Sequence, residues 1–288
     1  MRLFKYFSSD RLQILENRLI RFSPPSAFND PFEFLPSIKS IATPNELLEF
    51  VKEDAKKRGP ELFEQSGLSA LGVSEESFNN YLTSFLSNAE DFALQMMKAA
   101  IPRTQQTIFD SLNNNVGVLC LSEKNDDLLM WAHYADCHKG FVVEFDADSS
   151  FFNRKLSDKD SFRHLRKVRY NHRRPAVTLT DTNDEEIFLT KSSHWEYEAE
   201  WRIMLPLADA DSTVTVRGEV VSLFEVPLAA IKSVIFGAKF PESLSNDTME
   251  SLSFLEGYES LEFYKARIHL TDYSVVIEPA WPTLENNI

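Results

Sequence analysis

From Val116 onward the chain is a series of short segments that either alternate apolar and polar residues or are apolar throughout. These segments are VGVLCLS, GFVVEFD, HLRKVRY, EYEAEWRIML, VSLFEV, SVIFGAKF, LEFYKARI and YSVVIEP. Such patterns are typical of β-strands. Helices are expected only near residues 184–192 and 242–255, without a regular strand–helix alternation. We therefore predict the α+β class, with a largely antiparallel or mixed sheet.

A helical block lies between the first strands and this series. Thr43-Pro44-Asn45-Glu46 has the N-cap, the N1 proline and the N3 glutamate of a capping box. Gly59-Pro60 is expected to end the helix that begins there, and Pro102 is expected to separate two later helices. We predict one domain over residues 1–288, with residues 43–114 as a helical insertion or lid within it.

The formal net charge of −14 argues against a protein that binds nucleic acid through its overall field, because phosphate binding needs cations. One segment departs from this background. Residues 163–174, RHLRKVRYNHRR, contain only basic and uncharged side chains. A strand with a solvated basic face explains such a segment, and contact with phosphate or nucleic acid is the alternative. We expect nucleic-acid contact only through this patch.

Metal and membrane classes are not favoured. Cys120 and Cys137 make neither a disulfide framework nor a zinc pattern. His133 and His138 are five residues apart, so a continuous helix would not present both to one metal ion. The N-terminal residues lack a continuous apolar core, and no apolar run is long enough to span a bilayer. We expect a cytoplasmic protein without a metal or membrane contact.

The segment LMWAHYADCHKGFVVEFD, residues 129–146, has the densest group of polar side chains. Asp126 or Asp127 can cap a helix there, and Gly140 can break it before a strand over residues 141–145. The functional groups would then lie at the helix end and in the turn. A single histidine at such a place more often has a structural role. With that alternative open, we expect His138 to be catalytic. The expected ligand-binding residues are Trp131, His133, Tyr134 and Lys139.

A second group of polar residues lies in RFSPPSAFNDPFE, residues 21–33, where three prolines stiffen a turn. The expected ligand-binding residues are Arg21, Ser23, Asn29, Asp30 and Glu33. The alternative is structural, because Asn and Asp side chains before proline form turns by bonding to their own backbone.

A third group lies in KSSHWEYEAEWRI, residues 191–203. If EYEAEWR is a strand, Glu196, Glu198, Glu200 and Arg202 share one face. Three neighbouring carboxylates repel one another unless a cation, a ligand or a proton relieves them, so a glutamate in a cleft there would have a raised pKa. We expect Glu198 and Glu200 to be catalytic and Arg202 to pair with an acid and bind ligand. A solvated edge strand is the alternative.

Taken together, these motifs resemble a widespread bacterial family of unknown function. The resemblance rests on LFKY, LIRFSPPSAFNDPFE, VLCLSE followed by LMWAHYADCHKGFVVEFD, KVRY, WEYEAEWR and IFGAKF, in that order. It spans most of the chain apart from the helical block. It implies family membership without implying an activity.

A weaker resemblance is to the ADP-ribosyltransferase superfamily. Its members combine an N-terminal strand bearing Arg or His, a following strand often bearing Ser, and a late glutamate, sometimes as E-x-E. The counterparts here are Arg21 or Lys5, Ser23 and Glu198-Ala199-Glu200. This resemblance implies NAD as a substrate and implies that Glu200 supports the ribosyl transition state.

We therefore expect the three segments to form one cleft that binds a nucleotide-like or other phosphate-bearing small molecule. NAD-dependent ADP-ribosyl transfer is its most specific enzymatic form. The alternative is a non-catalytic module, such as a sensor or an antitoxin-like partner in a bacterial defence system, in which the same groups recognise a protein. The residues expected to share the pocket are Asn29, Asp30, His133, His138, Glu198 and Arg202.

Overall fold

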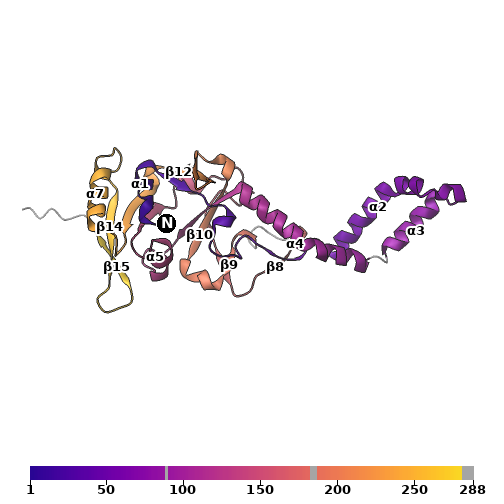
Figure 1. Cartoon of the computed structure of the whole chain (residues 1–288), viewed down its shortest axis with the longest axis horizontal. Helices are drawn as coiled ribbons and strands as arrows, with labels where there is room; N and C mark the ends of the chain where they lie inside the picture. The colour runs from indigo at the N-terminus through magenta and orange to yellow at the C-terminus, as the bar shows by residue number, and fades with distance from the viewer. Residues whose placement is uncertain (88–89, 182–186, 281–288) are drawn as a thin grey trace, which may run out of the picture. The chain divides into compact units, whose positions relative to one another are not determined.

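The computed structural model describes residues 1–87, 90–181 and 187–280 (Figure 1). The chain divides into two compact units. The first unit comprises Met1–Phe34, Ser111–Arg173 and Phe188–Ile288, and the second comprises Leu35–Asp110 and Arg174–Ile187. Among the described helices, none is both long and apolar enough to cross a membrane.

The first unit is built on an eight-stranded sheet. Across the sheet the strands are β15 (Val275–Pro279), β14 (Glu262–Ile268), β13 (Ile231–Phe236), β5 (Phe141–Asp146), β1 (Arg2–Phe7), β4 (Val116–Ser122), β10 (Glu200–Pro206) and β6 (Arg166–Lys167). Strands β13 and β14 pair in parallel, and the other described pairs of this sheet are antiparallel. The structure confirms the predicted α+β class with a mixed, largely antiparallel sheet.

Smaller elements complete this unit. A three-stranded sheet has the order β11 (Ser212–Val216), β12 (Glu219–Glu225) and β2 (Leu19–Arg21), and β7 (Arg169–Asn171) pairs in parallel with β9 (Thr190–Ser192). Its described α-helices include α1 (Ile14–Asn17), α5 (Leu128–Tyr134) and α7 (Glu242–Ser253). The 3₁₀ helices are η1 (Ser9–Arg11), η2 (Pro25–Ala27), η4 (Ser150–Phe152), η6 (Ser193–Glu198), η7 (Leu207–Asp209) and η8 (Leu228–Ala230).

The helix expected at 242–255 is confirmed by α7. The expectation at 184–192 is wrong at its end, because residues 190–192 form β9, and its residues 184–186 lie outside the described part of the chain. Pairing of β9 with β7 gives these three residues a strand conformation that their local sequence did not indicate.

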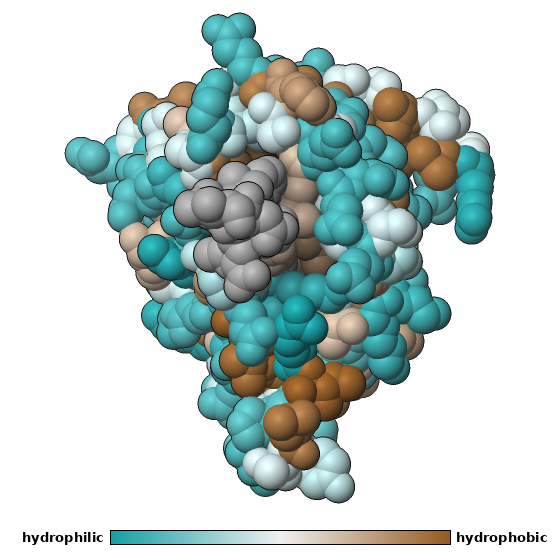
Figure 2. All heavy atoms as spheres, turned by 90° about the vertical axis from the view of Figure 1, so that its left-hand side faces the viewer, coloured by the Kyte–Doolittle hydropathy of each residue, from teal (hydrophilic) through white to brown (hydrophobic). Residues whose placement is uncertain are grey.

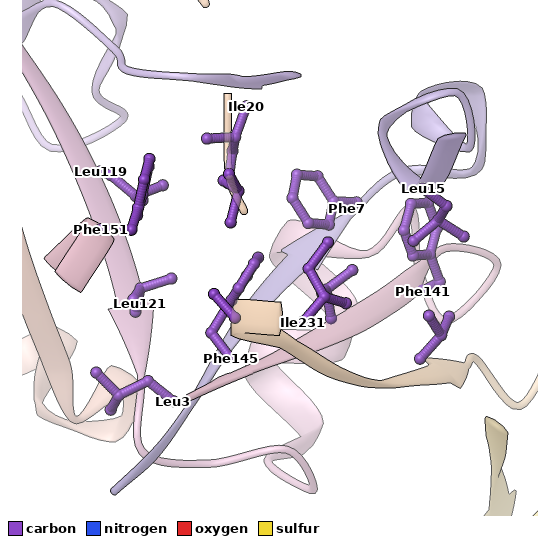
Figure 3. Packing of buried hydrophobic residues seen from close by; sticks show 14 of the residues in the cluster. Leu3, Phe7, Leu15, Ile20, Leu119, Leu121, Phe141, Phe145, Phe151 and Ile231 are labelled. Carbon is purple, nitrogen blue, oxygen red and sulfur yellow. The ribbon is translucent and has the colours of Figure 1, made fainter. Parts of the chain in front are cut away.

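Strand β1 runs through the centre of the large sheet and divides its apolar residues between two clusters. Leu3 and Phe7 belong to the main core, while Phe4 and Tyr6 belong to a second cluster with Trp131 of α5. This division follows the period of two in a strand, because successive side chains leave opposite faces. Figure 3 shows the main core, where Phe7 and Phe141 stack with ring centroids 5.3 Å apart.

The surface near the C-terminal strands carries exposed apolar side chains. Ile268, Leu270 and Tyr273 lie at the β14–β15 hairpin, and Leu270 and Tyr273 are fully exposed. Figure 2 views the molecule from the side of α7, β14 and β15, where separate apolar areas interrupt a hydrophilic surface. Exposed apolar groups of this kind can mark protein contacts.

The second unit contains α2 (Pro44–Ser66), α3 (Glu75–Ser87) and α4 (Glu90–Asn115), of which α4 continues into the first unit from Ser111. Strands β3 (Ser37–Ser40) and β8 (Ala176–Thr178) pair in parallel within it, and η3 (Leu68–Leu71) and η5 (Leu179–Asp181) are its short 3₁₀ helices. That residues 43–114 are an insertion or lid within a single domain stays a prediction.

Helix α2 begins as predicted and ends later than predicted. Thr43 Oγ1 accepts from the Glu46 backbone N–H at 3.3 Å, and Glu46 Oε2 accepts from the Thr43 N–H at 2.8 Å, which completes the capping box. The predicted stop at Gly59-Pro60 is wrong, because α2 continues to Ser66 and ends at left-handed Gly67. A Cβ on Gly59 would lie 2.7 Å from Asn79 Oδ1 of α3, a side-chain atom that can move aside.

Pro102 likewise does not separate two helices, because it lies inside α4. A proline removes one backbone hydrogen bond and costs about 3 kcal/mol inside a helix. A helix of 26 residues keeps its other hydrogen bonds on both sides of that position. The predicted break at Pro102 is therefore wrong.

Candidate functional site

A pocket of about 350 Å³ opens in the first unit, within the size range of small-molecule sites. Its walls come from β1, β4, α5, the segment after β2, and the segment from β9 to β10. The polar lining residues are Lys5, Ser23, Asn29, Ser122, His133, Tyr134, Lys191, Glu198 and Glu200. Phe4, Tyr6, Phe28 and Met130 are among the apolar ones.

The segment before β10 differs from the continuous strand that its alternation predicted. Residues Ser193–Glu198 form η6, which Ser192 caps, and β10 begins only at Glu200. Between them Ala199 has φ 44°, in the left-handed region. The expectation that Glu196 shares a face with Glu198 and Glu200 is therefore wrong. Glu196 is exposed, while the turn at Ala199 lets Glu198 and Glu200 both be buried at the pocket.

Five buried charged side chains form a network beside the pocket. Lys191 Nζ lies 2.5 Å from Glu198 Oε2, 3.0 Å from Glu200 Oε2 and 3.5 Å from Glu33 Oε1. Arg202 Nε lies 2.5 Å from Glu200 Oε1, and Arg202 Nη2 contacts Glu33. The most exposed of these residues, Lys191, is only 5% exposed. The predicted pairing of Arg202 with an acid is confirmed.

The surrounding structure fixes the two residues of β10. Arg202 Nη1 donates to the Phe188 carbonyl oxygen at 3.0 Å, and its guanidinium carbon lies 5.2 Å from the ring centroid of Phe34. The Glu200 backbone N–H donates to Tyr170 Oη at 2.9 Å. Pairing of β7 with β9 sets Tyr170 opposite Lys191. The small β7–β9 sheet thus holds the lysine against the strand that carries Glu200 and Arg202.

Glu198 has a different environment from Glu200. Tyr134 Oη donates to Glu198 Oε1 at 2.5 Å, and Asn29 Nδ2 donates to Tyr134 Oη at 3.0 Å. Burial raises the pKa of Glu198 to about 7, although the charge of Lys191 opposes the shift. Two linked side chains therefore orient a carboxyl group that exchanges its proton near neutral pH.

For Glu200, burial also acts to raise the pKa, but the charges of Arg202 and Lys191 outweigh it and hold the pKa well below the ordinary value. Glu200 is therefore ionised throughout the physiological range. Two neighbouring carboxyl groups whose environments separate their pKa values are typical of acid–base sites.

The segment from residue 21 to 33 divides among several roles. Ser23 and Asn29 line the pocket, and Glu33 belongs to the buried network. Asp30 is buried, and its Oδ1 accepts from the Phe32 backbone N–H at 2.9 Å, which is the turn-forming contact given above as the structural alternative. Arg21 lies in β2 and is not among the pocket-lining residues.

Helix α5 brings two of its predicted residues to the pocket. Asp127 caps it, accepting from the backbone N–H groups of Leu129 and Met130 at 3.0 and 3.2 Å. His133 and Tyr134 line the pocket, and His133 Nδ1 lies 2.9 Å from Tyr197 Oη. Trp131 is instead fully buried in the second apolar cluster and does not line the pocket.

The turn after α5 has three consecutive residues of positive φ, Asp136, Cys137 and His138. The His138 ring stacks on Trp131 with centroids 6.2 Å apart, and burial lowers the pKa of His138. Neither His138 nor Lys139 is among the residues that line the pocket. The catalytic role expected for His138 stays a prediction, and His138 does not line this pocket.

Two glycines lie where this turn contacts the segment that follows β13. The Gly237 N–H donates to the Gly140 carbonyl oxygen at 2.9 Å, and the Lys239 N–H donates to the His138 carbonyl oxygen at 2.9 Å. A Cβ on Gly140 would overlap the Phe7 carbonyl oxygen, and one on Gly237 would overlap the His138 carbonyl oxygen. Backbone meets backbone here without room for a side chain.

Sequence reasoning missed Lys191 and gave Lys5 only as a superfamily counterpart. The signal for Lys191 was present, because three carboxylates near one another require a cation and Lys191 opens the same segment. The partners of Lys191 on other strands were not visible from the sequence. Glu33, for example, reaches it from a distant segment of the chain.

The basic segment at residues 163–174 is partly compensated by acids. Arg163 lies 3.2 Å from Asp209, and Lys167 lies 2.6 Å from Glu123. Such pairing weakens the case for a free phosphate-binding face, and contact with nucleic acid through this patch stays a prediction. Within the described ranges, no cluster of three His, Cys, Asp or Glu residues is arranged to hold a metal ion.

Comparison with known proteins identifies a similar family. Neither curated proteins nor solved structures match the chain. Residues 130–203 match the model of a family described as a protein of unknown function (DUF2971). The matched segment runs from α5 into β10 and includes Tyr134, Lys191, Glu198 and Arg202, but its description names no ligand or reaction. The resemblance to a family of unknown function is therefore confirmed over residues 130–203, which are similar to DUF2971, while the motifs LFKY, LIRFSPPSAFNDPFE, VLCLSE and IFGAKF lie outside the matched segment.

Proposed function

We propose that the first unit is an enzyme that binds a nucleotide-like or phosphate-bearing ligand and uses Glu198 as its general acid–base. The observation that carries the proposal is the Glu198 carboxyl group, which lies at the pocket wall with a pKa of about 7. General acid–base catalysis is most effective when the pKa is near the working pH. Glu198 would give a proton to the bound ligand or take one from it.

Glu200 has a complementary role in this proposal. It lines the same pocket, and Lys191 and Arg202 keep it ionised. A fixed negative charge stabilises a transition state that develops positive charge. Glu198 would move the proton, while Glu200 would supply the constant field and hold Lys191 in place.

NAD-dependent ADP-ribosyl transfer is the specific reaction that we propose within this class. Its oxocarbenium-like transition state requires a carboxylate against the ribose, and the aromatic side chains of Phe4, Tyr6 and Phe28 supply surfaces for a ring. The pocket volume equals roughly a dozen water volumes of about 30 Å³ each. It would therefore enclose one nucleoside half of NAD, with the other half outside.

The test is nicotinamide release from NAD by the purified protein, compared with Glu198→Gln and Glu196→Gln. Glu196 is the matched control, because it lies two residues away and is exposed. We expect turnover by the wild type and by Glu196→Gln and its loss in Glu198→Gln, with a cooperative melting transition in all three proteins. The ADP-ribosyl reaction is refuted if the wild type releases no nicotinamide with protein, nucleic-acid or water acceptors. The wider proposal fails if neither NAD nor nucleoside phosphates raise the melting temperature.

The competing proposal is a non-catalytic module that recognises a protein, such as an antitoxin-like partner in a defence system. The exposed Ile268, Leu270 and Tyr273 at the β14–β15 hairpin favour it, because exposed apolar groups mark contact surfaces. In that case ligands would bind without turnover, and neither the wild type nor Glu198→Gln would release nicotinamide.

A further inference from the structure

We propose that Lys5 is the anion-binding residue of the pocket and that the ligand carries one phosphate-like group close to an aromatic ring. This inference rests on the proposed function, since it assigns the ligand of that same pocket. Lys5 lies in β1, near the centre of the large sheet, and is one of the residues that line the pocket.

The Lys5 ammonium group has unused hydrogen-bonding capacity. Its Nζ donates to the Cys120 carbonyl oxygen at 2.9 Å, and no ion pair joins it to an acid among the described residues. An ammonium group has three N–H donors, so two remain for a ligand. Lys191, the other lysine that lines the pocket, is surrounded by the carboxylates of Glu33, Glu198 and Glu200. Lys5 is therefore the pocket lysine that can bind an anionic ligand without breaking an ion pair to a carboxylate.

The charge of the surroundings permits an anion at Lys5. The buried network has the three carboxyl groups of Glu33, Glu198 and Glu200 against the cations Lys191 and Arg202. With Lys5 included, three cationic side chains face three carboxyl groups. Because Glu198 holds its proton for part of the time near neutral pH, the set is then neutral or positive. A phosphate group would not meet a net negative field.

The neighbours of Lys5 indicate what is attached to the anionic group. Phe4 and Tyr6 flank it in β1, and Phe28 and Met130 complete an apolar wall of the same pocket. All of these residues line one pocket of about 350 Å³, so the anionic group and the apolar part of the ligand lie close together. A phosphate joined to a nucleoside has this arrangement.

The experiment measures equilibrium binding of three probes, namely AMP, adenosine and inorganic phosphate. The variants are Lys5→Met, Lys5→Arg and the matched control Lys155→Met, whose lysine is exposed and not among the pocket-lining residues. We expect AMP to bind the wild type more tightly than adenosine does. Lys5→Met should weaken AMP binding at least about tenfold, as expected for loss of hydrogen bonds to a charged group, and should leave adenosine binding unchanged. Lys5→Arg should restore part of the loss, and Lys155→Met should have no effect.

The outcomes separate this inference from the proposed function. If AMP binds but Lys5→Met binds it as tightly as the wild type, or if AMP binds no more tightly than adenosine, the role of Lys5 is refuted while the ligand pocket stands. If none of the three probes binds the wild type, the assignment of a phosphate-bearing ligand fails as well. Should Lys5→Met not fold, Lys5→Arg decides, because it keeps the charge and must retain preference for AMP over adenosine.

Discussion

Replacing Arg202 with Leu should be among the most destabilising single substitutions in the first unit. Arg202 is 1% exposed, and its guanidinium group contacts Glu33 and Glu200. Without it, Lys191 alone faces both of these carboxylates and Glu198. Removing one partner of a buried ion pair costs about 3–5 kcal/mol, because a buried charge is left uncompensated. We expect a loss of unfolding free energy of this size at pH 7.

The control is Arg267→Leu. Arg267 lies 2.8 Å from Glu278, but both side chains are more than half exposed. An exposed pair contributes about 0–1 kcal/mol. Denaturant unfolding followed by tryptophan fluorescence suits this comparison, because Trp131, Trp195 and Trp201, the tryptophans in the described part of the chain, all belong to the first unit.

The pH dependence gives a second criterion. Arg202 helps to hold the pKa of Glu200 below its ordinary value of 4.5, so ionised Glu200 stabilises the fold above that pH, and this contribution is lost as the pH falls toward the folded-state pKa. In Arg202→Leu the depression is reduced, so the deficit should shrink as the pH is lowered below 4.5. The reasoning is refuted if Arg202→Leu is no less stable than Arg267→Leu at pH 7.

Three further predictions concern the same segment. Glu200→Gln should lower the melting temperature as well as turnover, because Arg202 and Lys191 lose their shared acid, and a stable but inactive variant would contradict this. Ala199→Val should destabilise the fold by about 1 kcal/mol or more, because a branched side chain disfavours the positive φ of this residue. Ala199→Gly should not destabilise it. Equal melting temperatures for the two variants would count against strain at this turn. The pKa of Glu198 is raised from 4.5 to about 7, so between pH 4.5 and pH 7 the folded state binds more protons than the unfolded state. The stability of the wild type should therefore fall as the pH rises through that range. In Glu198→Gln a melting curve series should lack that component of the decline, and an identical pH dependence in both proteins would refute the assignment.

Features that depend on a few neighbouring residues could be predicted from the sequence. The capping box at Thr43 and the N-cap at Asp127 are both present, because each needs only side-chain and backbone groups within one helical turn. The class of the fold followed in the same way from the alternation of the strands. The helix stops at Gly59-Pro60 and Pro102 were wrong, since packing and helix length outweighed local preference.

The site could be predicted only in part. Its three segments were found, but η6 was mistaken for strand because Glu196, Glu198 and Glu200 alternate with other residues as they would in a strand. The contact of Glu33 with Arg202 joins residues far apart in the chain, and the position of Lys191 depends on the pairing of β7 with β9. Such contacts exist only after the sheet has formed, so no local pattern encodes them.

The backbone contact between Gly140 and Gly237 provides a criterion for recognising relatives by sequence. Gly140 precedes β5 and Gly237 follows β13, and both positions exclude every side chain, including a methyl group, as long as the turn after α5 keeps its contact with the segment after β13. Substitution at one glycine cannot be offset by a smaller residue at the other, because carbonyl oxygens are the obstacle. A homologue with this junction must therefore have glycine at both positions. One that has lost either glycine must have rebuilt the turn that precedes β5.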